Sequence, residues 1–278
     1  PVGPNGELII DYSIYDAKKA GVNKVIFVIK EEMRSQFEET IGKRINKIIP
    51  VAYVYQRLSA TPIPVKIKRT RPWGTGQALL SSEPEVEENF MVINADDFYG
   101  RDAFLKLGDF LKKSNKDQYA MVGYLLKNTL SDNGTVSRGV IELNKDNTLK
   151  KITEYTKIKR VGDQIIDQET NQELGQEKIV SLNLFGFSKE IFPFATTYFK
   201  TFLETEKKLE EKEFYLPSIV DNLIEKEKKQ VSVLFTTSTF HGMTYQMDLQ
   251  ELKEYIRKQI DLGIYPNHLW EEQNEQQK

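Results

Sequence analysis

Apolar residues recur in two alternating patterns along the first 130 residues. Ile10, Ile14 and Ala17 are spaced four and three residues apart, which is the spacing of one face of an α-helix. Residues 24–29 instead form a nearly continuous apolar run, typical of a parallel strand buried on both faces. Because such segments alternate up to residue 125, the first half predicts a mostly parallel sheet with right-handed crossovers.

The other elements expected in this half follow the same two patterns. We expect strands over residues 51–56, 90–94 and 119–125. We expect helices along the stripe from Met33 to Ile41, ending at Gly42, from a cap at Thr75 to about Ser82, and along Phe104, Leu107 and Leu111.

The pattern changes character after residue 130. Turn signals at residues 132–134 and 145–147 predict a hairpin that pairs residues 139–143 with 148–153, and a second hairpin is expected over 158–166. The Lys- and Glu-rich residues 201–212 predict a solvated helix face, residues 249–262 a final helix, and residues 271–278 a frayed tail. We therefore divide the chain into residues 1–130, residues 131–248, which end with a return to the sheet, and residues 249–278.

Composition narrows the classes of function. Apolar residues make up 39% of the 278 residues, enough for one large α/β domain or for one domain with an inserted lobe. Lys and Arg (39) nearly balance Asp and Glu (41), which argues against a dedicated nucleic-acid binder. With no cysteine and two histidines, thiolate sites and multi-histidine metal clusters are excluded, so a bound metal would have oxygen ligands and would be magnesium or calcium.

No apolar run in the sequence approaches the ~20 residues of a membrane span, and no signal-peptide pattern is visible. We therefore expect a cytoplasmic protein with no membrane or nucleic-acid partner. The sequence does not decide whether the protein forms a homo-oligomer.

The segment Asn94–Asp97 (Asn-Ala-Asp-Asp) follows an apolar strand. Ligands of open parallel sheets bind beyond the carboxyl ends of the strands, where two carboxylates are well placed to hold a divalent cation. The alternative is an ordinary strand-to-helix loop in which the acids cap a helix.

The segment Arg71–Ala78 places two glycines around Thr75, just before a predicted helix. Glycines let the backbone approach a flat or anionic ligand closely, and backbone N–H and C=O groups can then contact the edge of a base. The alternative is a plain helix start with Thr75 near the N-cap. The segment is not a Walker A loop, because no Gly-Lys-Ser/Thr follows.

Together with the Pro1–Gly3 turn and the Ile10–Tyr12 helix start, these segments resemble the sugar-phosphate nucleotidyltransferase family. Gly74–Ala78 resembles its base-reading Gly-Thr-Gly-His-Ala, and Asn94–Gly100 resembles its Gly-Asp-x-x-Phe-Tyr-Gly. The resemblance is specific at these three segments and loose in the second half. It implies an α/β fold with a doubly wound, mostly parallel three-layer sheet like that of GT-A enzymes, with a smaller α+β lobe on the sugar side.

The resemblance also implies roles for individual residues. Asp96 would bind Mg²⁺, and Asp248 is a candidate second metal ligand, with Thr244 as the alternative in another register. Asp96 and Asp248 are the candidate catalytic residues. The nucleotide would contact Gly3, Gln56, Gly74, Thr75 and Asp96, and the acceptor would contact Asp97, Gly139, Glu154 and Asn183. Residues 131–248 would thus form the acceptor-binding lobe, with the nucleotide bound by residues 1–130.

The implied reaction joins a nucleoside triphosphate to a phosphorylated small molecule and releases pyrophosphate. The acceptor stays open among glucose 1-phosphate, an amino-sugar phosphate and phosphocholine. A Gly-Thr-Gly turn with a side-chain amide suits uracil or thymine, so UTP or dTTP is the expected nucleotide. Two alternatives remain: a GT-A glycosyltransferase, and a non-catalytic nucleotide-binding module.

The family pattern opens with a strand, a Gly-rich loop containing Arg, and a Lys, none of which is found between Pro1 and the first predicted helix. We expect the natural chain to extend upstream by on the order of 20 residues, the usual size of one strand and one loop.

Overall fold

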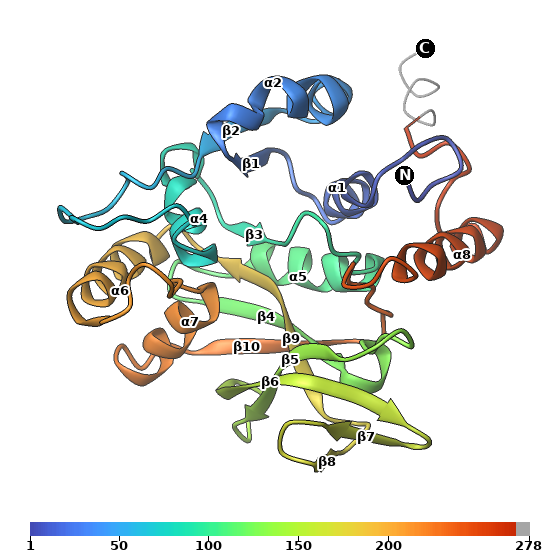
Figure 1. The fold of residues 1–278 in the computed structure, drawn as a ribbon. Coiled ribbons are helices and arrows are strands. Elements are labelled where there is room, and N and C mark those ends of the chain that lie inside the picture. The colour runs from blue at the N-terminus through green and yellow to red at the C-terminus, as the bar shows by residue number, and fades with distance from the viewer. Residues whose placement is uncertain (271–278) are drawn as a thin grey trace.

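The strands form two sheets that are not hydrogen-bonded to each other (Figure 1). The computed structural model describes residues 1–270. Within this range β1 (Val25–Ile29) and β2 (Val51–Tyr55) form a parallel pair. The remaining strands belong to one eight-stranded sheet in the order β10-β4-β9-β5-β6-β7-β8, and β3 also pairs with β9.

Strand direction in the larger sheet confirms the expected α/β class. β4 (Tyr119–Leu125) is parallel to β10 (Val231–Thr236). β9 (Ile179–Phe187) is antiparallel both to β4 and to β3 (Phe90–Val92). β3, β4 and β10 therefore point the same way, and β9 is the one reversed strand among these four.

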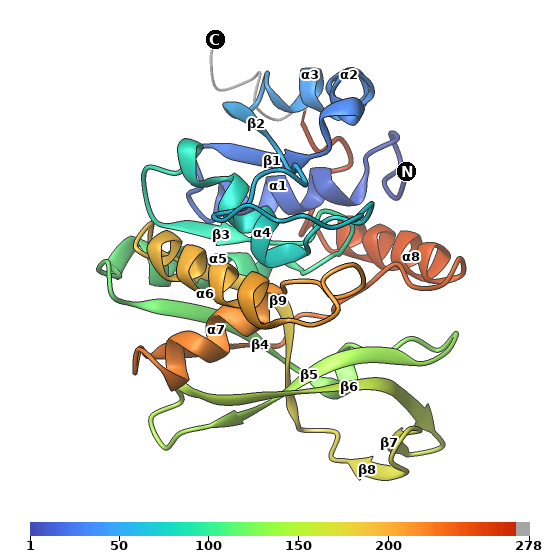
Figure 2. The same cartoon turned by 60° about the vertical axis from the view of Figure 1, so that its left-hand side comes forward.

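Helices cover the strands in two layers. α1 (Ile9–Lys19) and α5 (Arg101–Lys113) pack against each other on one side. α4 (Thr75–Ser81), α6 (Ile191–Thr205) and α7 (Leu216–Glu225) pack together on the other side. Figure 2 shows this second group in front of the strands, with α5 behind them. Apolar side chains fill the space on both faces, which gives the predicted three layers.

The two predicted hairpins are present and extend the larger sheet. Their strands occupy the lower part of Figure 1 and are antiparallel: β5 (Val136–Leu143), β6 (Leu149–Val161), β7 (Gln164–Asp167) and β8 (Gln172–Leu174). Asn147 and Gly162 take positive φ at the two turns, which Asn and Gly tolerate best.

The C-terminal helix α8 (Asp248–Asp261) begins one residue before the expected start and ends one residue before the expected end. Two short 3₁₀ turns lie in the connections: η3 (Glu83–Glu85) precedes β3, and η4 (Leu126–Asn128) follows β4. None of the helices within residues 1–270 is long and apolar enough to cross a membrane. The predicted frayed tail, residues 271–278, lies outside the described residues.

The predicted helix end at Gly42 is wrong. The segment consists of η1 (Glu31–Met33), α2 (Arg34–Phe37), a π-helical turn η2 (Glu38–Gly42) and α3 (Lys43–Ile45). Gly42 has helical backbone angles, and a Cβ there would overlap the hydroxyl of Tyr53. The glycine therefore permits close packing on β2 and does not terminate the helix.

Candidate active site

A glycine turn leads into α4. Gly74 occupies the N-cap with φ 106° and ψ −178°, so the expectation that Thr75 caps this helix is wrong, and Thr75 is the first helical residue. A Cβ at Gly74 would lie 2.7 Å from the carbonyl oxygen of Phe214. Both the backbone angles and this contact require glycine.

Residues far along the chain hold this turn in place. The Gly76 amide donates to the Phe214 carbonyl at 2.8 Å, and the Phe214 amide donates to the Trp73 carbonyl at 2.6 Å. The Thr75 hydroxyl accepts a hydrogen bond from the Leu216 amide at 2.9 Å. The backbone of the turn is thus ordered by contacts within the protein itself.

Arg69 reinforces the same turn, and the sequence offered no signal for this role. Its side chain is 9% exposed, and its guanidinium lies 4.4 Å from the centre of the Trp73 ring. The guanidinium donates to four backbone carbonyls, those of Arg71, Pro72, Leu209 and Lys212. Residues 201–212 are the predicted solvated helix only as far as Thr205, where α6 ends. The carbonyls of Leu209 and Lys212, beyond the helix, bind Arg69.

Gln56 follows β2 and faces the turn. Its Nε2 donates to the Gly74 carbonyl at 2.9 Å, and its backbone amide donates to the Ile29 carbonyl at 3.0 Å. The structure therefore brings together three predicted nucleotide residues: Gln56, Gly74 and Thr75.

Gly3 was also predicted to contact the nucleotide. It lies in a tight turn before α1. The amides of Val2 and Gly3 both donate to the Glu7 carbonyl, at 2.8 and 3.0 Å. A Cβ at Gly3 would overlap the Glu7 carboxylate. The Glu7 carboxylate in turn accepts from the backbone amide of Asn5 at 2.8 Å.

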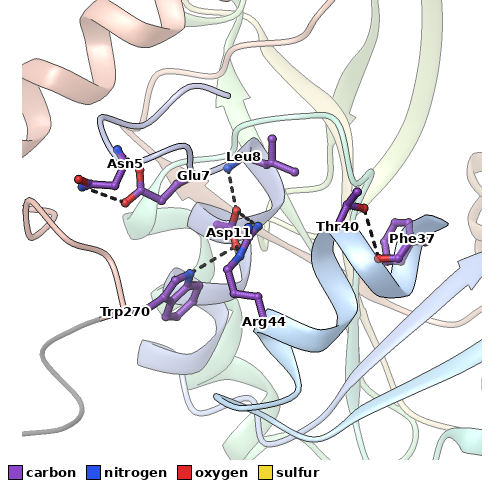
Figure 3. A network of polar contacts seen from close by, with 8 residues as sticks. All are labelled: Asn5, Glu7, Leu8, Asp11, Phe37, Thr40, Arg44 and Trp270. Carbon is purple, nitrogen blue, oxygen red and sulfur yellow. Dashed lines mark hydrogen bonds and ion pairs between the residues drawn. The ribbon is translucent and has the colours of Figure 1, made fainter. Parts of the chain in front are cut away.

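The first turn of α1 is anchored by the buried carboxylate of Asp11 (Figure 3). It accepts hydrogen bonds from the Leu8 amide at 2.7 Å, from Arg44 at 2.6 and 3.1 Å, and from the Trp270 ring at 3.3 Å. This network ties α1 to α3 and to the C-terminal region.

The acidic segment after β3 carries one free and one constrained carboxylate. Asp96 is exposed, and within residues 1–270 no hydrogen bond or ion pair engages its carboxylate. Asp97 is half-buried and accepts a hydrogen bond from Asn94 Nδ2 at 2.8 Å. Burial raises the pKa of Asp97 to about 6, although the Asn94 hydrogen bond opposes this shift. Gly100, not an acid, occupies the N-cap of α5, so the helix-capping alternative does not apply.

A distant segment packs beside these acids. Phe98 and His241 exchange backbone hydrogen bonds of 3.0 and 3.1 Å. A Cβ at Gly242 would lie 3.4 Å from Asp97 Oδ1. Burial lowers the pKa of His241 to about 4, so the imidazole is neutral at pH 7 and does not compensate the negative charge.

Arg138 on β5 supplies the compensating positive charge. Its guanidinium donates to the carbonyl and hydroxyl of Thr129. Burial lowers the pKa of Arg138 to about 10, while three acids raise it, in decreasing order Asp97, Glu154 and Asp248. Arg138 therefore stays charged at pH 7. The sequence analysis missed this residue, and its position next to Gly139 was the available signal.

Two predicted acceptor residues are partners across strands. Gly139 pairs with Glu154 on β6 and with Ser181 on β9. A Cβ at Gly139 would lie 2.7 Å from Ile152 Cγ2 and 3.3 Å from Glu154 Oε2. Asn183 on β9 is another predicted acceptor residue. Its φ is 61°, an uncommon conformation for a non-glycine residue.

Asp248 is 4% exposed and begins α8. Its Oδ1 accepts from Ser131 at 2.7 Å and from Asn133 at 2.9 Å, and its Oδ2 accepts from the amides of Thr244 and Tyr245 at 3.1 and 2.7 Å. Although burial alone would raise the pKa of Asp248, these hydrogen bonds lower it. Within residues 1–270, no group of three or more His, Asp or Glu side chains is placed to hold a metal ion.

The two halves of the site meet at one cavity between β1 and β3. Its lining includes Thr75 from the glycine turn, Asn94 and Ala95 from the acidic segment, and Asn183 from β9. The glycine turn and the start of the acidic segment therefore border the same cavity. Asn94 and Ala95 follow the carboxyl end of β3, where ligands of α/β sheets bind.

Comparison with known proteins agrees with this arrangement. The family model described as nucleotidyl transferase matches residues 2–272. The fold is similar to that of a Bacillus anthracis protein assigned as a glucose-1-phosphate thymidylyltransferase and solved in complex with sucrose, with a TM-score of 0.58 and 14% identity over 92% of this chain and 85% of that one. No curated protein matches the sequence. The chain therefore belongs to the nucleotidyl transferase family, as its glycine turn and acidic segment predicted, and it is a nucleotidyltransferase.

Proposed function

We propose that the enzyme condenses a nucleoside triphosphate with a sugar 1-phosphate to give a nucleotide sugar and pyrophosphate. One observation carries the proposal: Thr75 of the ordered glycine turn lines the same cavity as Asn94 and Ala95, which directly precede the exposed Asp96. The turn suits a base, and the carboxylate suits the cation that accompanies phosphates. The Bacillus anthracis protein with a similar fold is assigned to this type of reaction.

The chemistry needs positioning more than proton transfer. A phosphate oxygen of the acceptor attacks the α-phosphorus in line, the bond from the α-phosphorus to the bridging oxygen breaks, and pyrophosphate leaves with that electron pair. Because the nucleophile is already an anion, no general base is required. The protein contributes by orienting the reactants and stabilising the negative charge that develops.

We propose Asp96 as the ligand of Mg²⁺, which would neutralise phosphate charge when bound. An exposed carboxylate with no protein partner is free to bind a cation. The role of Asp248 as a second ligand stays a prediction. It would require Asp248 to exchange some of its four hydrogen bonds for the metal.

We propose that the acceptor binds beside Asp97, in the lobe formed by residues 131–248. Glu154, the cross-strand partner of Gly139, is exposed and available to accept hydroxyl hydrogen bonds. The contact of Gly139 with the sugar stays a prediction, because Ile152 and Glu154 fill the space beside its Cα. Asn183 would contact the sugar from β9. Arg138 offsets the charge of the nearby acids, so that an anionic phosphate can approach.

We propose that the enzyme prefers UTP or dTTP to ATP and GTP, with CTP intermediate. Because Gln56 Nε2 is used by the Gly74 carbonyl, its Oε1 is the atom left to accept the N–H of uracil or thymine. A buried polar group without a partner costs about 1–3 kcal/mol, which corresponds to a roughly tenfold to hundredfold preference.

The test is a pyrophosphate-release assay of five nucleotides against glucose 1-phosphate, an amino-sugar phosphate and phosphocholine. We expect release only when an acceptor is present, with the highest kcat/KM for UTP or dTTP. The Gln56→Ala variant should lose this preference, while the exposed Gln250→Ala control should keep it. A purine preference, or an unchanged preference in Gln56→Ala, contradicts the base assignment. Absence of acceptor-dependent pyrophosphate release contradicts the reaction.

A further inference from the structure

β9 carries a bulge at Asn183, the predicted acceptor residue. The strand is in register with β4 at Ser181 and again at Phe185. Residues 182–184 therefore lie opposite a single residue of β4, and Asn183 in their middle has a φ of 61°. Bulges beside active sites turn a side chain in a new direction, and Asn tolerates this conformation better than most residues.

The pairing of β3 with β9 ends at the same place. Val92 lies opposite Phe185, and within residues 1–270 the ladder has no pair beyond this one. The next backbone groups on the two sides, the amide of Asn94 and the carbonyl of Leu182, therefore need partners other than each other.

The hydroxyl of Tyr99 joins these two groups. It accepts a hydrogen bond from the Asn94 amide at 3.1 Å and donates one to the Leu182 carbonyl at 3.0 Å. A phenol hydroxyl has a single proton to donate, so this link uses its donor capacity fully. The acidic segment and the bulge of β9 are thus connected through one oxygen atom.

Tyr99 is itself held firmly. Its side chain is fully buried, and its ring packs edge-on against Phe104 and Phe240, with centroids 6.1 and 5.5 Å away. Its carbonyl accepts a hydrogen bond from the Tyr124 hydroxyl at 2.9 Å. Burial raises the pKa of Tyr99 well above its usual value, so the hydroxyl keeps its proton and stays a donor at pH 7.

Both ends of this link carry groups of the candidate site. On one side, Asn94 Nδ2 donates to Asp97 at 2.8 Å, and Asp96 lies between these two residues in the chain. On the other side, Asn183 lines the cavity, and within residues 1–270 no hydrogen bond engages its side-chain amide. This amide is therefore available to a ligand.

We propose that Tyr99 is a positioning residue whose hydroxyl orients Asn183 toward the acceptor relative to the acidic segment. The inference rests on the proposed function, because it assumes that the acceptor contacts Asn183 and that Asp96 binds the metal. Tyr99 is buried and does not touch a substrate, so it acts through the two backbone groups that it joins. A hydroxyl that only stabilised the core would change the stability of the protein and leave acceptor binding as it is.

Amide hydrogen exchange tests the link without any measurement of activity. Tyr99→Phe keeps the ring and removes the hydroxyl, so the Asn94 amide should exchange about tenfold faster or more, as expected when a buried hydrogen bond is lost. Tyr198→Phe is the matched control, because it removes another buried hydroxyl, which donates to Glu227 at 3.0 Å on α6. This control should leave the exchange of Asn94 unchanged. Equal exchange of Asn94 in Tyr99→Phe and in the unmodified protein overturns the proposal.

Kinetics test the consequence for the acceptor. Pyrophosphate release is measured with whichever of the three acceptors the unmodified protein turns over fastest. Tyr99→Phe should raise the KM for this acceptor about tenfold, the effect of one buried hydrogen bond, and should leave the KM for the nucleotide unchanged. Tyr198→Phe should change neither KM.

A double-mutant cycle with Asn183→Gly separates positioning from a structural role. Glycine accepts the positive φ and removes the side chain, so Asn183→Gly alone should raise the acceptor KM at least as much. Tyr99→Phe should then add nothing in the Asn183→Gly background, because both changes remove the same contact. An unchanged acceptor KM in either single variant, or an equal further rise in the double variant, overturns the proposal. Absence of release by the unmodified protein contradicts the reaction instead, and the exchange of Asn94 then decides the link by itself.

Discussion

The glycine turn at residues 73–76 and the acidic segment at residues 94–97 border the same cavity, through Thr75, Asn94 and Ala95, but are built differently. The turn is fixed by hydrogen bonds to Phe214 and Leu216 and by the carbonyl contacts of Arg69. The acidic segment has one internal hydrogen bond, from Asn94 to Asp97, and an exposed Asp96.

This difference indicates how the glycine turn and the acidic segment can each bind a ligand. A turn that binds through its backbone must have its shape set in advance, because backbone groups cannot change rotamer to meet a ligand. A carboxylate that waits for a cation needs charge and access. We therefore expect substitutions in the turn to act through shape, and substitutions in the acidic segment to act through charge.

The largest effect is expected for Asp96→Asn. Loss of a metal ligand should remove several kcal/mol of charge stabilisation and reduce kcat roughly 10³-fold or more. The melting temperature should change little, because no protein group depends on this carboxylate. Steady-state kinetics with varied magnesium measures the effect, and Asp109→Asn, on the exposed face of α5, is the matched control. Near-normal activity at low magnesium would show that Asp96 is not the ligand.

Gly74→Ala should have the next largest effect, through shape. The backbone angles are open essentially only to glycine, and the new Cβ would meet the Phe214 carbonyl at 2.7 Å. We expect a loss of about 1–3 kcal/mol in the free energy of unfolding and a KM for the nucleotide raised about tenfold or more. Chemical denaturation and kinetics measure the two quantities. Gly175→Ala, where the space is open, should change neither, and an unchanged KM in Gly74→Ala would contradict a shape-based role.

Arg69→Lys should weaken the turn without changing net charge. An ammonium cannot reproduce the planar fork that contacts four carbonyls and stacks on Trp73. We expect a loss of about 1–3 kcal/mol in stability, as for hydrogen bonds to charged groups, and a severalfold rise in KM for the nucleotide with kcat little changed. The neighbouring exposed Arg71→Lys is the control. A fall in kcat at constant KM would indicate a role in the chemistry and not in positioning.

The smallest effect concerns the pH dependence of stability at Asp97. Because its pKa rises to about 6 on folding, the folded protein binds this proton more tightly than the unfolded chain. The associated stability is fully present below about pH 4 and is lost as the pH rises through about 6. Relative to the natural protein, Asp97→Asn should be more stable by about 1–3 kcal/mol at pH 7.5 and nearly equal at pH 4.

Urea denaturation at several pH values measures this difference, with the exposed Asp132→Asn as control. A stability difference that does not change with pH would show that Asp97 is not desolvated in the folded protein.

The local patterns of the sequence determined much of the fold and the main outline of the site. Apolar runs predicted β1, β2 and β4 to within a residue, because a buried strand must be apolar over its own length. Turn residues predicted both hairpins, since only a few residue types accept positive φ. The glycine turn and the acidic segment were also recognisable as local sequence.

Only the tertiary structure decided how distant groups meet. Arg69 binds carbonyls about 140 residues away, Arg138 lies among acids from three other segments, and the carboxylate of Asp248 is engaged by Ser131 and Asn133. No local pattern encodes such contacts, because they depend on where the chain crosses itself.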